Sequence, residues 1–284
     1  MGGAVLVGLD GTGHSEPAVR WGAEEAAVRN LPLHLLHSWV SQPWSVSSVP
    51  ESAERRRYGT EALRRAEAIA KEMHPGIPVK AEQVAEKAAD ALAGRSGEST
   101  LLVLGSRGHD SIAGFLMGSV SLCVLGRAEC PVITVREQEA SVGPGPEIVV
   151  GVSGQEGSAG DAVLDYAFTA ASAHRACLHA VRARTPSTAL DVGTAPTPDE
   201  TDRTAAERES LSASLAPWRE KYPNVQVIEE VLDGGAVPTL LGACSRAGLL
   251  VVGRRTQRMP MPLGPSVLAF LHHSCCPVAV VPRK

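Results

Sequence analysis

Three features that would each assign the chain to a particular class are absent from the sequence. No apolar run approaches the roughly 20 residues that a helix needs to span a bilayer. No two cysteines have CxxC spacing, and no GxxxxGK segment followed by Ser or Thr, the signature of Walker-type NTPases, occurs. We therefore expect no membrane partner, reduced cysteines instead of a disulfide framework, and no P-loop.

An excess of positive charge is also missing. The 284-residue chain has a formal net charge of −4 and is 44% hydrophobic, which is typical of a globular protein and not of one that neutralises nucleic-acid phosphates. The opening MGGAVLVGLDGTG has no basic residue before a short apolar run that ends at Asp10, so it predicts a first strand and not a signal peptide. These observations predict a cytoplasmic protein without a nucleic-acid partner.

Four segments of the first half return in the second half in the same order, at offsets between 142 and 148 residues. They are AVLVGLD (4–10) with EIVVGVS (147–153), LHLLHSW (33–39) with RACLHAV (175–181), LLVLGSR (101–107) with LLVVGRR (249–255), and ECPVITV (129–135) with CCPVAVV (275–281). Between the halves, REQEASVGPGP (136–146) has the composition of an exposed linker. The chain is predicted to be two copies of one domain, residues 1–141 and 142–284.

Within each copy, β-branched strand-like runs alternate with longer helical patterns. The segment SEPAVRWGAEEAAVRN offers Ser15 as an N-cap and Pro17 in the first turn, followed by apolar residues at helical spacing. Strands connected by helices indicate an α/β fold in which helices cover both faces of a parallel sheet. In such sheets, ligands bind beyond the carboxyl ends of the strands.

The segment GSRGHDSIAGFLMGSVS, residues 105–121, follows the predicted strand LLVL and has the chemistry of a phosphate site. Gly105 and Gly108 lack β-carbons, so the main chain can turn sharply and come close to a ligand. Gly118-Ser119-Val120-Ser121 opens the next helix, whose unpaired N–H groups and serine hydroxyls favour an anion. The glycines therefore predict a nucleotide at the end of the fourth strand.

Asp10 ends the first strand and should face the same crevice as Gly105. Its carboxylate could bind ribose hydroxyls or a base edge, or it could accept hydrogen bonds from the amides of a local turn, and the sequence leaves both interpretations open. His37 and His179 recur at the same position of the repeated segment inside apolar strands. That position predicts packed, hydrogen-bonded histidines and not catalytic ones.

Two segments resemble ligand-binding motifs only in part. GTGHSE (11–16) nearly matches the dinucleotide-binding GxGxxG, but Glu16 replaces the third glycine. HHSCC (272–276) has the composition of a metal site without its spacing. We therefore expect neither a nicotinamide or flavin dinucleotide site nor a metal centre.

The spacing G-x2-G-x9-G followed by Ser, here Gly105, Gly108, Gly118 and Ser119, resembles the ATP-binding motif of universal stress proteins. The opening VLVGLDGT, the strand ending in LH and the closing CPV segment also resemble that family at the same relative places. The likeness covers nearly the whole chain, twice. It implies two tandem five-stranded parallel-sheet domains of the adenine nucleotide alpha hydrolase-like type, with helices on both faces.

The resemblance also implies a site and a function. Domain 1 would bind ATP, with or without Mg²⁺, and the chain would be a nucleotide-responsive stress or regulatory factor. Adenosine would lie near Asp10 and Ser38, whereas EKAADAL, from residue 86, departs from the small-residue-then-proline turn of the family. The implied binding residues are Leu9, Asp10, Ser38, Gly105, Arg107, Gly108, Gly118, Ser119, Val120 and Ser121.

No catalytic or metal-binding residue is assigned, so the chain is not expected to be an enzyme beyond a weak ATPase. The alternative is an enzyme that hydrolyses ATP or transfers its phosphoryl group, for which His109 and Asp110 are the nearby candidates. A scaffold that has lost ligand binding is a third interpretation. The intact first-copy motif argues against it.

The second copy is predicted to hold a degenerate site. Ser153 stands where the first copy has Asp10, and Pro265 stands where it has Ser119. We therefore expect one nucleotide per chain. By resemblance, the two domains pair around a pseudo-two-fold axis, and a homodimer of whole chains and an unidentified regulatory protein are the other expected partners.

Overall fold

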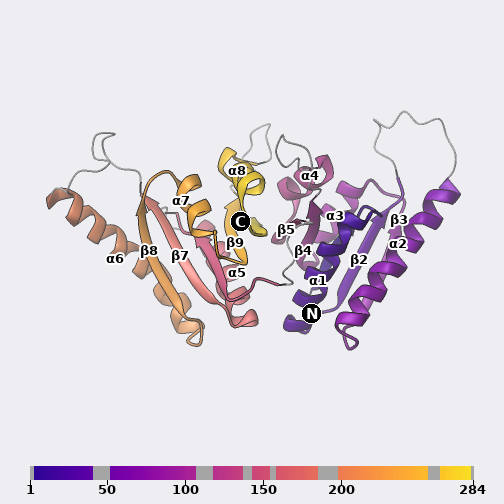
Figure 1. Ribbon diagram of the computed structural model, residues 1–284, viewed down its shortest axis with the longest axis horizontal. Helices are drawn as coiled ribbons and strands as arrows, with labels where there is room; N and C mark the ends of the chain where they lie inside the picture. Colours follow the sequence, from indigo (N-terminus) through magenta and orange to yellow (C-terminus); the bar gives the residue numbers. More distant parts are fainter. Residues whose placement is uncertain are drawn as a thin grey trace. The chain divides into compact units, whose positions relative to one another are not determined.

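The computed structural model describes residues 3–40, 52–106, 118–136, 143–153, 158–184, 198–254 and 263–282. The chain divides into two compact units, and the main boundary between them lies between Gly143 and Pro144. In Figure 1 each unit is a sheet flanked by helices, with the first unit drawn from indigo to magenta and the second from pink to yellow.

Within the described residues, the first unit contains a parallel sheet of five strands. Their bounds are β1 Ala4–Leu9, β2 Leu33–Ser38, β3 Val79–Val84, β4 Ser99–Ser106 and β5 Val132–Arg136. The strand order is β3-β2-β1-β4-β5, so the chain moves outward from β1 to β3 and then crosses back to place β4 beside β1. The gap between the carboxyl ends of β1 and β4 is the topological switch point, where sheets of this kind bind ligands.

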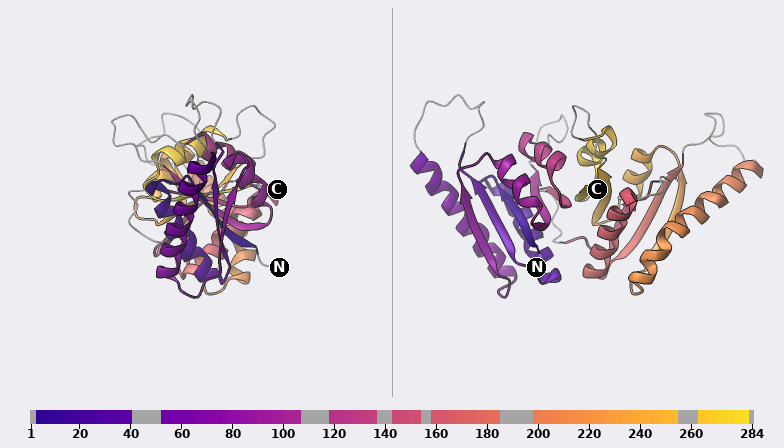
Figure 2. Two further views of the ribbon diagram at one scale, coloured as in Figure 1. Left: turned by 90° about the vertical axis from the view of Figure 1, so that its right-hand side faces the viewer. Right: turned by 180° about the vertical axis from the view of Figure 1, so that it is seen from behind.

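Helices connect these strands and cover both faces of the sheet (Figure 2). The short η1 (Gly13–Ser15) leads into α1 (Glu16–Arg29), which packs beside α2 (Ser52–Met73). On the other face, α3 (Ala88–Ser96) packs beside α4 (Ser119–Arg127). Each helix returns the chain to the amino edge of the sheet, so helix amino termini lie at the carboxyl edge.

The first helix shows how local sequence sets an element. It follows Ser15, has a proline in its first turn, and ends at Asn30, whose φ of 54° is the left-handed conformation of a helix C-cap. The helix predicted from SEPAVRWGAEEAAVRN is thus confirmed. The expected cap is not, because the Ser15 hydroxyl donates to the carboxylate of Asp10 at 2.8 Å instead of capping the helix.

The second unit repeats this architecture in the part of it that the structure describes. Its strands are β6 Glu147–Gly151, β7 Cys177–Arg184, β8 Val227–Asp233, β9 Leu249–Arg254 and β10 Val278–Pro282. Their order, β8-β7-β6-β9-β10, equals that of the first unit strand for strand. The helices are α5 Ser158–His174, α6 Pro198–Lys221, α7 Ala236–Ala243 and α8 Pro265–His273. The predicted duplication and parallel α/β fold are confirmed.

Strand register corrects one detail of the internal alignment. Leu6 of β1 lies opposite His34 of β2, and the equivalent Val149 of β6 lies opposite His179 of β7. His179 therefore corresponds to His34, and the prediction that it shares a repeat position with His37 is wrong. The error arises because the strand LHLLHS contains the dipeptide LH twice, so sequence alone fits the second copy to either place.

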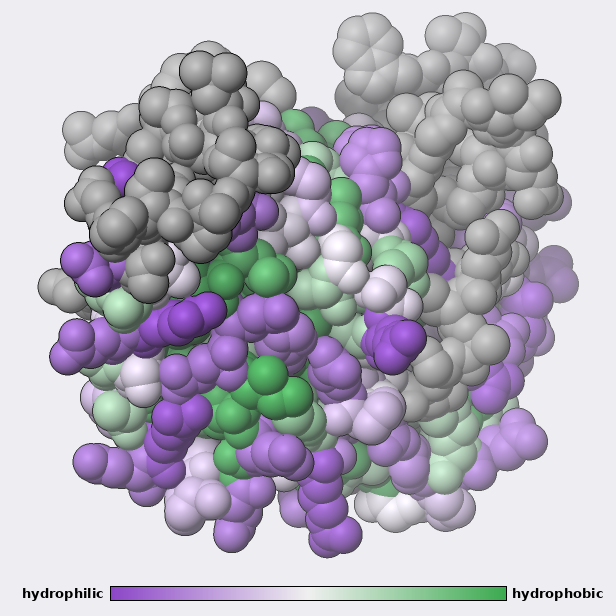
Figure 3. All heavy atoms as spheres, turned by 60° about the vertical axis from the view of Figure 1, so that its left-hand side comes forward, coloured by the Kyte–Doolittle hydropathy of each residue, from purple (hydrophilic) through white to green (hydrophobic). Residues whose placement is uncertain are grey.

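Large apolar side chains are buried in both units. Among the described residues, Tyr58 and Ile228 are the large hydrophobic side chains that remain exposed, at 52% and 47%. The face drawn in Figure 3 is mainly hydrophilic, with hydrophobic residues in small patches between polar ones. No helix in the described part of the chain combines the length and the apolar character needed to cross a membrane.

Candidate functional site

The carboxyl ends of three neighbouring strands meet at one edge of the first sheet. Gly8 of β1 lies opposite Leu104 of β4, and β2 lies on the other side of β1. Asp10, Ser38 and Gly105 therefore lie at the same edge. The structure thus brings together three of the residues that the sequence analysis places at a nucleotide.

Asp10 organises the turn that follows β1. Its Oδ1 accepts hydrogen bonds from the Thr12 N–H at 2.9 Å, the Thr12 hydroxyl at 2.6 Å and the Ser15 hydroxyl at 2.8 Å. Between them, Gly11 has a φ of 85°, a conformation that residues with a β-carbon rarely adopt. These contacts support the local-turn interpretation of Asp10. The residue is also exposed at the sheet edge, so the turn and a ligand role are compatible.

Gly105 has a packing role that the sequence did not reveal. A β-carbon at this position would lie 2.6 Å from the carbonyl oxygen of His14 and 3.5 Å from the α-carbon of Ser15. The space left by the missing side chain is therefore filled by the main chain of η1. Packing therefore explains why this position has no side chain, and the approach of the Gly105 main chain to a ligand stays a prediction.

The amino terminus of α4 is open at the same sheet edge. Gly118 is the N-cap, with φ −64° and ψ 150°, and no side chain among the described residues caps the helix. The N–H groups of Ser119, Val120 and Ser121 precede the first intrahelical hydrogen bond, which runs from the Leu122 N–H to the Gly118 carbonyl at 3.0 Å. A β-carbon on Gly118 would have no atom of the described residues within 4 Å. This end therefore offers donors and a positive helix dipole to an anion.

The remaining predicted residues are partly outside the description. Arg107 and Gly108 lie beyond the described residues, as do His109 and Asp110 of the enzymatic alternative. Leu9 is buried and lines a pocket beside α1 and α2. Within the described ranges, no group of three or more His, Cys, Asp or Glu residues is arranged to hold a metal ion.

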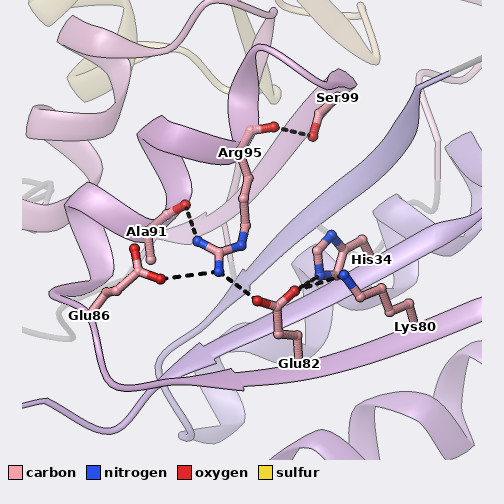
Figure 4. Close-up of polar contacts among 7 residues, drawn as sticks. All are labelled: His34, Lys80, Glu82, Glu86, Ala91, Arg95 and Ser99. Carbon is pink, nitrogen blue, oxygen red and sulfur yellow. Dashed lines mark hydrogen bonds and ion pairs between the residues drawn. The ribbon is translucent and has the colours of Figure 1, made fainter.

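Ser38 is tied to the loop between β3 and α3. Its hydroxyl donates to the carbonyl oxygen of Glu86 and accepts from the Val40 N–H at 3.3 Å. Arg95 of α3 holds the same loop, because its Nη2 lies 3.2 Å from the Glu86 carboxylate and 2.6 Å from that of Glu82 (Figure 4). EKAADAL departs here from the proline-containing turn of the family. Side-chain hydrogen bonds and ion pairs hold this loop between β3 and α3 in place.

Glu82 is the centre of that network. Its carboxylate also contacts His34 Nε2 at 2.7 Å and Lys80 Nζ at 2.9 Å (Figure 4). Burial by itself would raise the pKa of Glu82, but hydrogen bonds from Arg95, Lys80 and His34 outweigh it and lower the pKa to about 2. The pKa of His34 is also lowered, first by burial and then by the charge of Lys80. The network therefore holds the loop between β3 and α3 in place. Its ion pairs connect β2, β3 and α3, which are separated in the sequence.

His37 lies on the opposite face of β2 from His34 and is 5% exposed. A β-carbon on Gly11 would lie 3.3 Å from its Nε2, and one on Gly59 would lie 2.5 Å from its Nδ1. Burial lowers the pKa of His37, although the charge of Asp10 opposes the shift. The predicted packing is confirmed. The predicted hydrogen bonding is not found at Nδ1, which is buried and has no partner among the described residues.

A pocket opens on the α1 and α2 face beside the Asp10 turn. Its walls are the main chain of the turn at Gly11, Val19 of α1, and Ala62 and Ala66 of α2, with Arg65 at its edge. Part of its lining lies in the GTGHSE segment (11–16). The sequence did not predict a pocket there, because α1 and α2 are separated in the chain and meet through tertiary packing.

The second unit keeps the framework of the site but not its residues. Gly264 is the N-cap of α8 as Gly118 is of α4, and a β-carbon on Gly264 would also have no atom within 4 Å. Pro265 follows it where the first unit has Ser119, so a hydroxyl and an N–H donor are absent. A serine also follows β6 at the place where a carboxylate follows β1.

Comparisons with known proteins agree with this architecture. The sequence profile of the universal stress protein family matches residues 1–136 and 146–282. A universal stress protein of Mycobacterium tuberculosis is 33% identical over an alignment 293 positions long, which covers 97% of this chain and 96% of the relative. A solved universal stress protein from Archaeoglobus fulgidus, 18% identical, covers 99% of this chain and 98% of its own with a TM-score of 0.67. Another, solved in complex with cAMP and 27% identical, covers 48% of this chain and 98% of its own, with a TM-score of 0.37.

Proposed function

The chain belongs to the universal stress protein family, and we propose that its first unit binds ATP and that the bound nucleotide makes the protein a regulatory factor. The open amino terminus of α4 is the observation that carries this proposal. It combines a helix end without a side-chain cap among the described residues, small residues, and exposure of Gly118 and Ser119 at the carboxyl edge of the sheet. Phosphate groups are the ligands that such helix ends favour.

Each described residue then has a separate task. The N–H groups of Ser119, Val120 and Ser121, with the two serine hydroxyls, would bind phosphate oxygens. Gly118 itself adds no side-chain atoms beside these donors. Asp10 and Ser38, at the ends of β1 and β2, would contact the nucleoside.

We propose a binding protein and not an efficient enzyme. Fast phosphoryl transfer requires groups that hold Mg²⁺ and orient the attacking water or acceptor, and no described residue near α4 is assigned such a task. If Mg²⁺ accompanies ATP, the Ser119 and Ser121 hydroxyls are the nearby oxygen donors. The effect of binding would then be a change of surface that a regulatory partner recognises.

The test is calorimetric titration of nucleotide-free full-length protein with ATP, ADP, AMP and cAMP, each with and without Mg²⁺. We expect saturable binding that is strongest for a nucleotide with more than one phosphate, because α4 offers several donors. Acid extraction of freshly purified protein identifies any nucleotide carried from the cell. Absence of binding by all four ligands to a folded protein would overturn the proposal.

We also propose that the two domains pair around a pseudo-two-fold axis, as the family resemblance implies for a tandem chain. Chemical cross-linking with mass spectrometry, together with NMR relaxation, tests this pairing. Reproducible cross-links between the domains and a single rotational correlation time would support it. Two independently tumbling domains would contradict it.

A further inference from the structure

Three cysteines of the second unit come together at the amino edge of its sheet. Cys244 is the C-cap of α7 and precedes β9, while Cys275 and Cys276 lie between α8 and β10. All three are free thiols. The nucleotide proposal concerns carboxyl edges, so this cluster is independent of it.

The three thiols differ in exposure. Cys244 is fully buried and Cys276 is 4% exposed, whereas Cys275 lies at the surface. The Cys275 thiol donates a hydrogen bond to the main-chain carbonyl of Cys244 at 3.3 Å, so the exposed sulfur is held against the buried residue. An oxidant in solution therefore meets Cys275 first, at a sulfur that contacts the main chain of Cys244.

Local hydrogen bonds keep the cluster in place and Cys244 in its thiol form. The fully buried Ser274 hydroxyl donates to the Cys276 carbonyl at 2.9 Å and accepts from the Cys276 N–H at 3.3 Å. A hydrogen bond with the Cys276 thiol, together with burial, raises the pKa of Cys244 far above its usual value. Because thiolates are the reactive form of cysteine, an oxidant reacts with the exposed Cys275 before it reacts with Cys244.

The first unit shows that the fold does not require the Cys244 and Cys275 thiols, whereas it keeps a cysteine, Cys130, at the position of Cys276. Aligning the units on their fourth and fifth strands places Ser96 at the position of Cys244 and Glu129 at that of Cys275. There the Ser96 hydroxyl accepts a hydrogen bond from the Glu129 N–H at 2.9 Å. The same junction is thus built with serine and glutamate, so packing does not account for the cysteine pair of the second unit.

We propose that Cys244 and Cys275 form a peroxide-sensitive modification site whose oxidised form is a disulfide between them. The Cys275 sulfur attacks one oxygen of hydrogen peroxide, the O–O bond breaks, and a sulfenic acid and one water are formed. The Cys244 sulfur then attacks the Cys275 sulfur, the S–O bond breaks, and the hydroxyl leaves as a second water with the proton of the Cys244 thiol. Two thiols and one peroxide give one disulfide and two waters. A thiol reductant reverses the change, as in redox-sensing cysteine pairs.

The experiment is peptide mapping of full-length protein after a short peroxide treatment. The reaction is quenched with acid, free thiols are alkylated, and the protein is digested with trypsin. Cleavage after Arg246 separates Cys244 from Cys275. We expect a cross-linked peptide pair that has lost two hydrogens and that disappears after dithiothreitol. Fragment ions between Cys275 and Cys276 identify the linked sulfur.

Three variants complete the test. Cys244→Ser and Cys275→Glu introduce the residues that the first unit carries at these positions, so we expect both to fold and to lose the cross-link. Cys123→Ser, in the first unit, is the matched control and should keep it. Oxidation of wild-type Cys275 to sulfinic or sulfonic acid without a link to Cys244 would overturn the proposal. A link that persists in Cys275→Glu would also overturn it. The wild-type map decides the question even if a variant fails to fold.

Discussion

A β-carbon on Gly105 would lie 2.6 Å from the carbonyl oxygen of His14. Neither main chain can yield easily, because one belongs to β4 and the other to η1. We therefore expect Gly105→Ala to lower the free energy of unfolding by about 1–3 kcal/mol, the usual cost of forcing extra atoms into a packed site. Urea denaturation measures this change. Gly118→Ala is the control, since its β-carbon enters open space, and an equal loss of stability in both variants would contradict the packing argument.

Gly118→Val tests the phosphate site itself. We expect the fold to tolerate the larger side chain, because no atom of the described residues lies within 4 Å of the β-carbon position. The valine side chain would, however, stand beside the donors of α4. A loss of about 2–3 kcal/mol of binding free energy would raise the dissociation constant for ATP roughly 30- to 150-fold in calorimetric titration. Gly264→Val, at the equivalent helix end of the second unit, should leave the affinity unchanged. Unchanged affinity in a folded Gly118→Val protein would remove the proposed site.

One nucleotide per chain is expected, because the second unit lacks the Asp10 carboxylate and the Ser119 donors. The measurement is the stoichiometry of ATP binding to nucleotide-free full-length protein. Asp10→Ser, which copies the residue of the second unit, should weaken the single site, and Ser153→Asp should not create another. Two equivalent sites in the wild-type chain would refute the predicted asymmetry.

The Glu82 network predicts an acid dependence of stability. The pKa of Glu82 in the folded protein, about 2, is below its usual value of 4.5, so the unfolded chain takes up a proton more readily. The stabilisation is therefore complete above about pH 4.5 and is lost as the pH falls towards 2. Urea denaturation from pH 7 to 3 should show a smaller acid loss in Glu82→Gln than in the wild type. Parallel curves would show that the Arg95, Lys80 and His34 contacts do not stabilise the ionised carboxylate.

ATP turnover should be absent or far slower than the roughly 1–1000 s⁻¹ that is typical of enzymes. The physical reason is that binding donors at α4 stabilise phosphates without supplying a base for the attacking water. Phosphate release under single- and multiple-turnover conditions measures this rate. Steady release at about 1 s⁻¹ that disappears in an Asp110 variant would favour the enzymatic alternative.

Local sequence patterns predicted much of the fold. The sequence predicted the strands, the helix after Ser15 and the duplication. It could do so because hydrophobic periodicity, helix-terminal residues and repeated segments are properties of residues close together in the chain. The parallel order followed from the alternation of strands and helices. The helix start at Gly118 was also predictable, since Gly118 and the serines after it lie within one short segment.

Side-chain partners were much less predictable. The sequence suggested that the main chain at Gly105 approaches a ligand and that the Ser15 side chain caps a helix. In the structure the main chain of η1 fills the space beside Gly105, and the Ser15 hydroxyl donates to Asp10. The sequence did not predict the Glu82 network, because Arg95 of α3 contacts Glu82 of β3 only in the folded chain. The cysteine cluster joins Cys244 to a residue 31 positions away, a separation that no spacing rule describes.

By itself, the sequence determined that this protein is a tandem pair of parallel α/β domains with a glycine- and serine-rich helix start after the fourth strand. Periodicity and repetition express which residues must be buried, and burial is the main driving force of folding. Only the tertiary structure decided that His179 matches His34 and that main chain fills the space beside Gly105. Those outcomes depend on strand register and on close packing between distant segments, where a shift of one residue turns a side chain to the other face of the sheet.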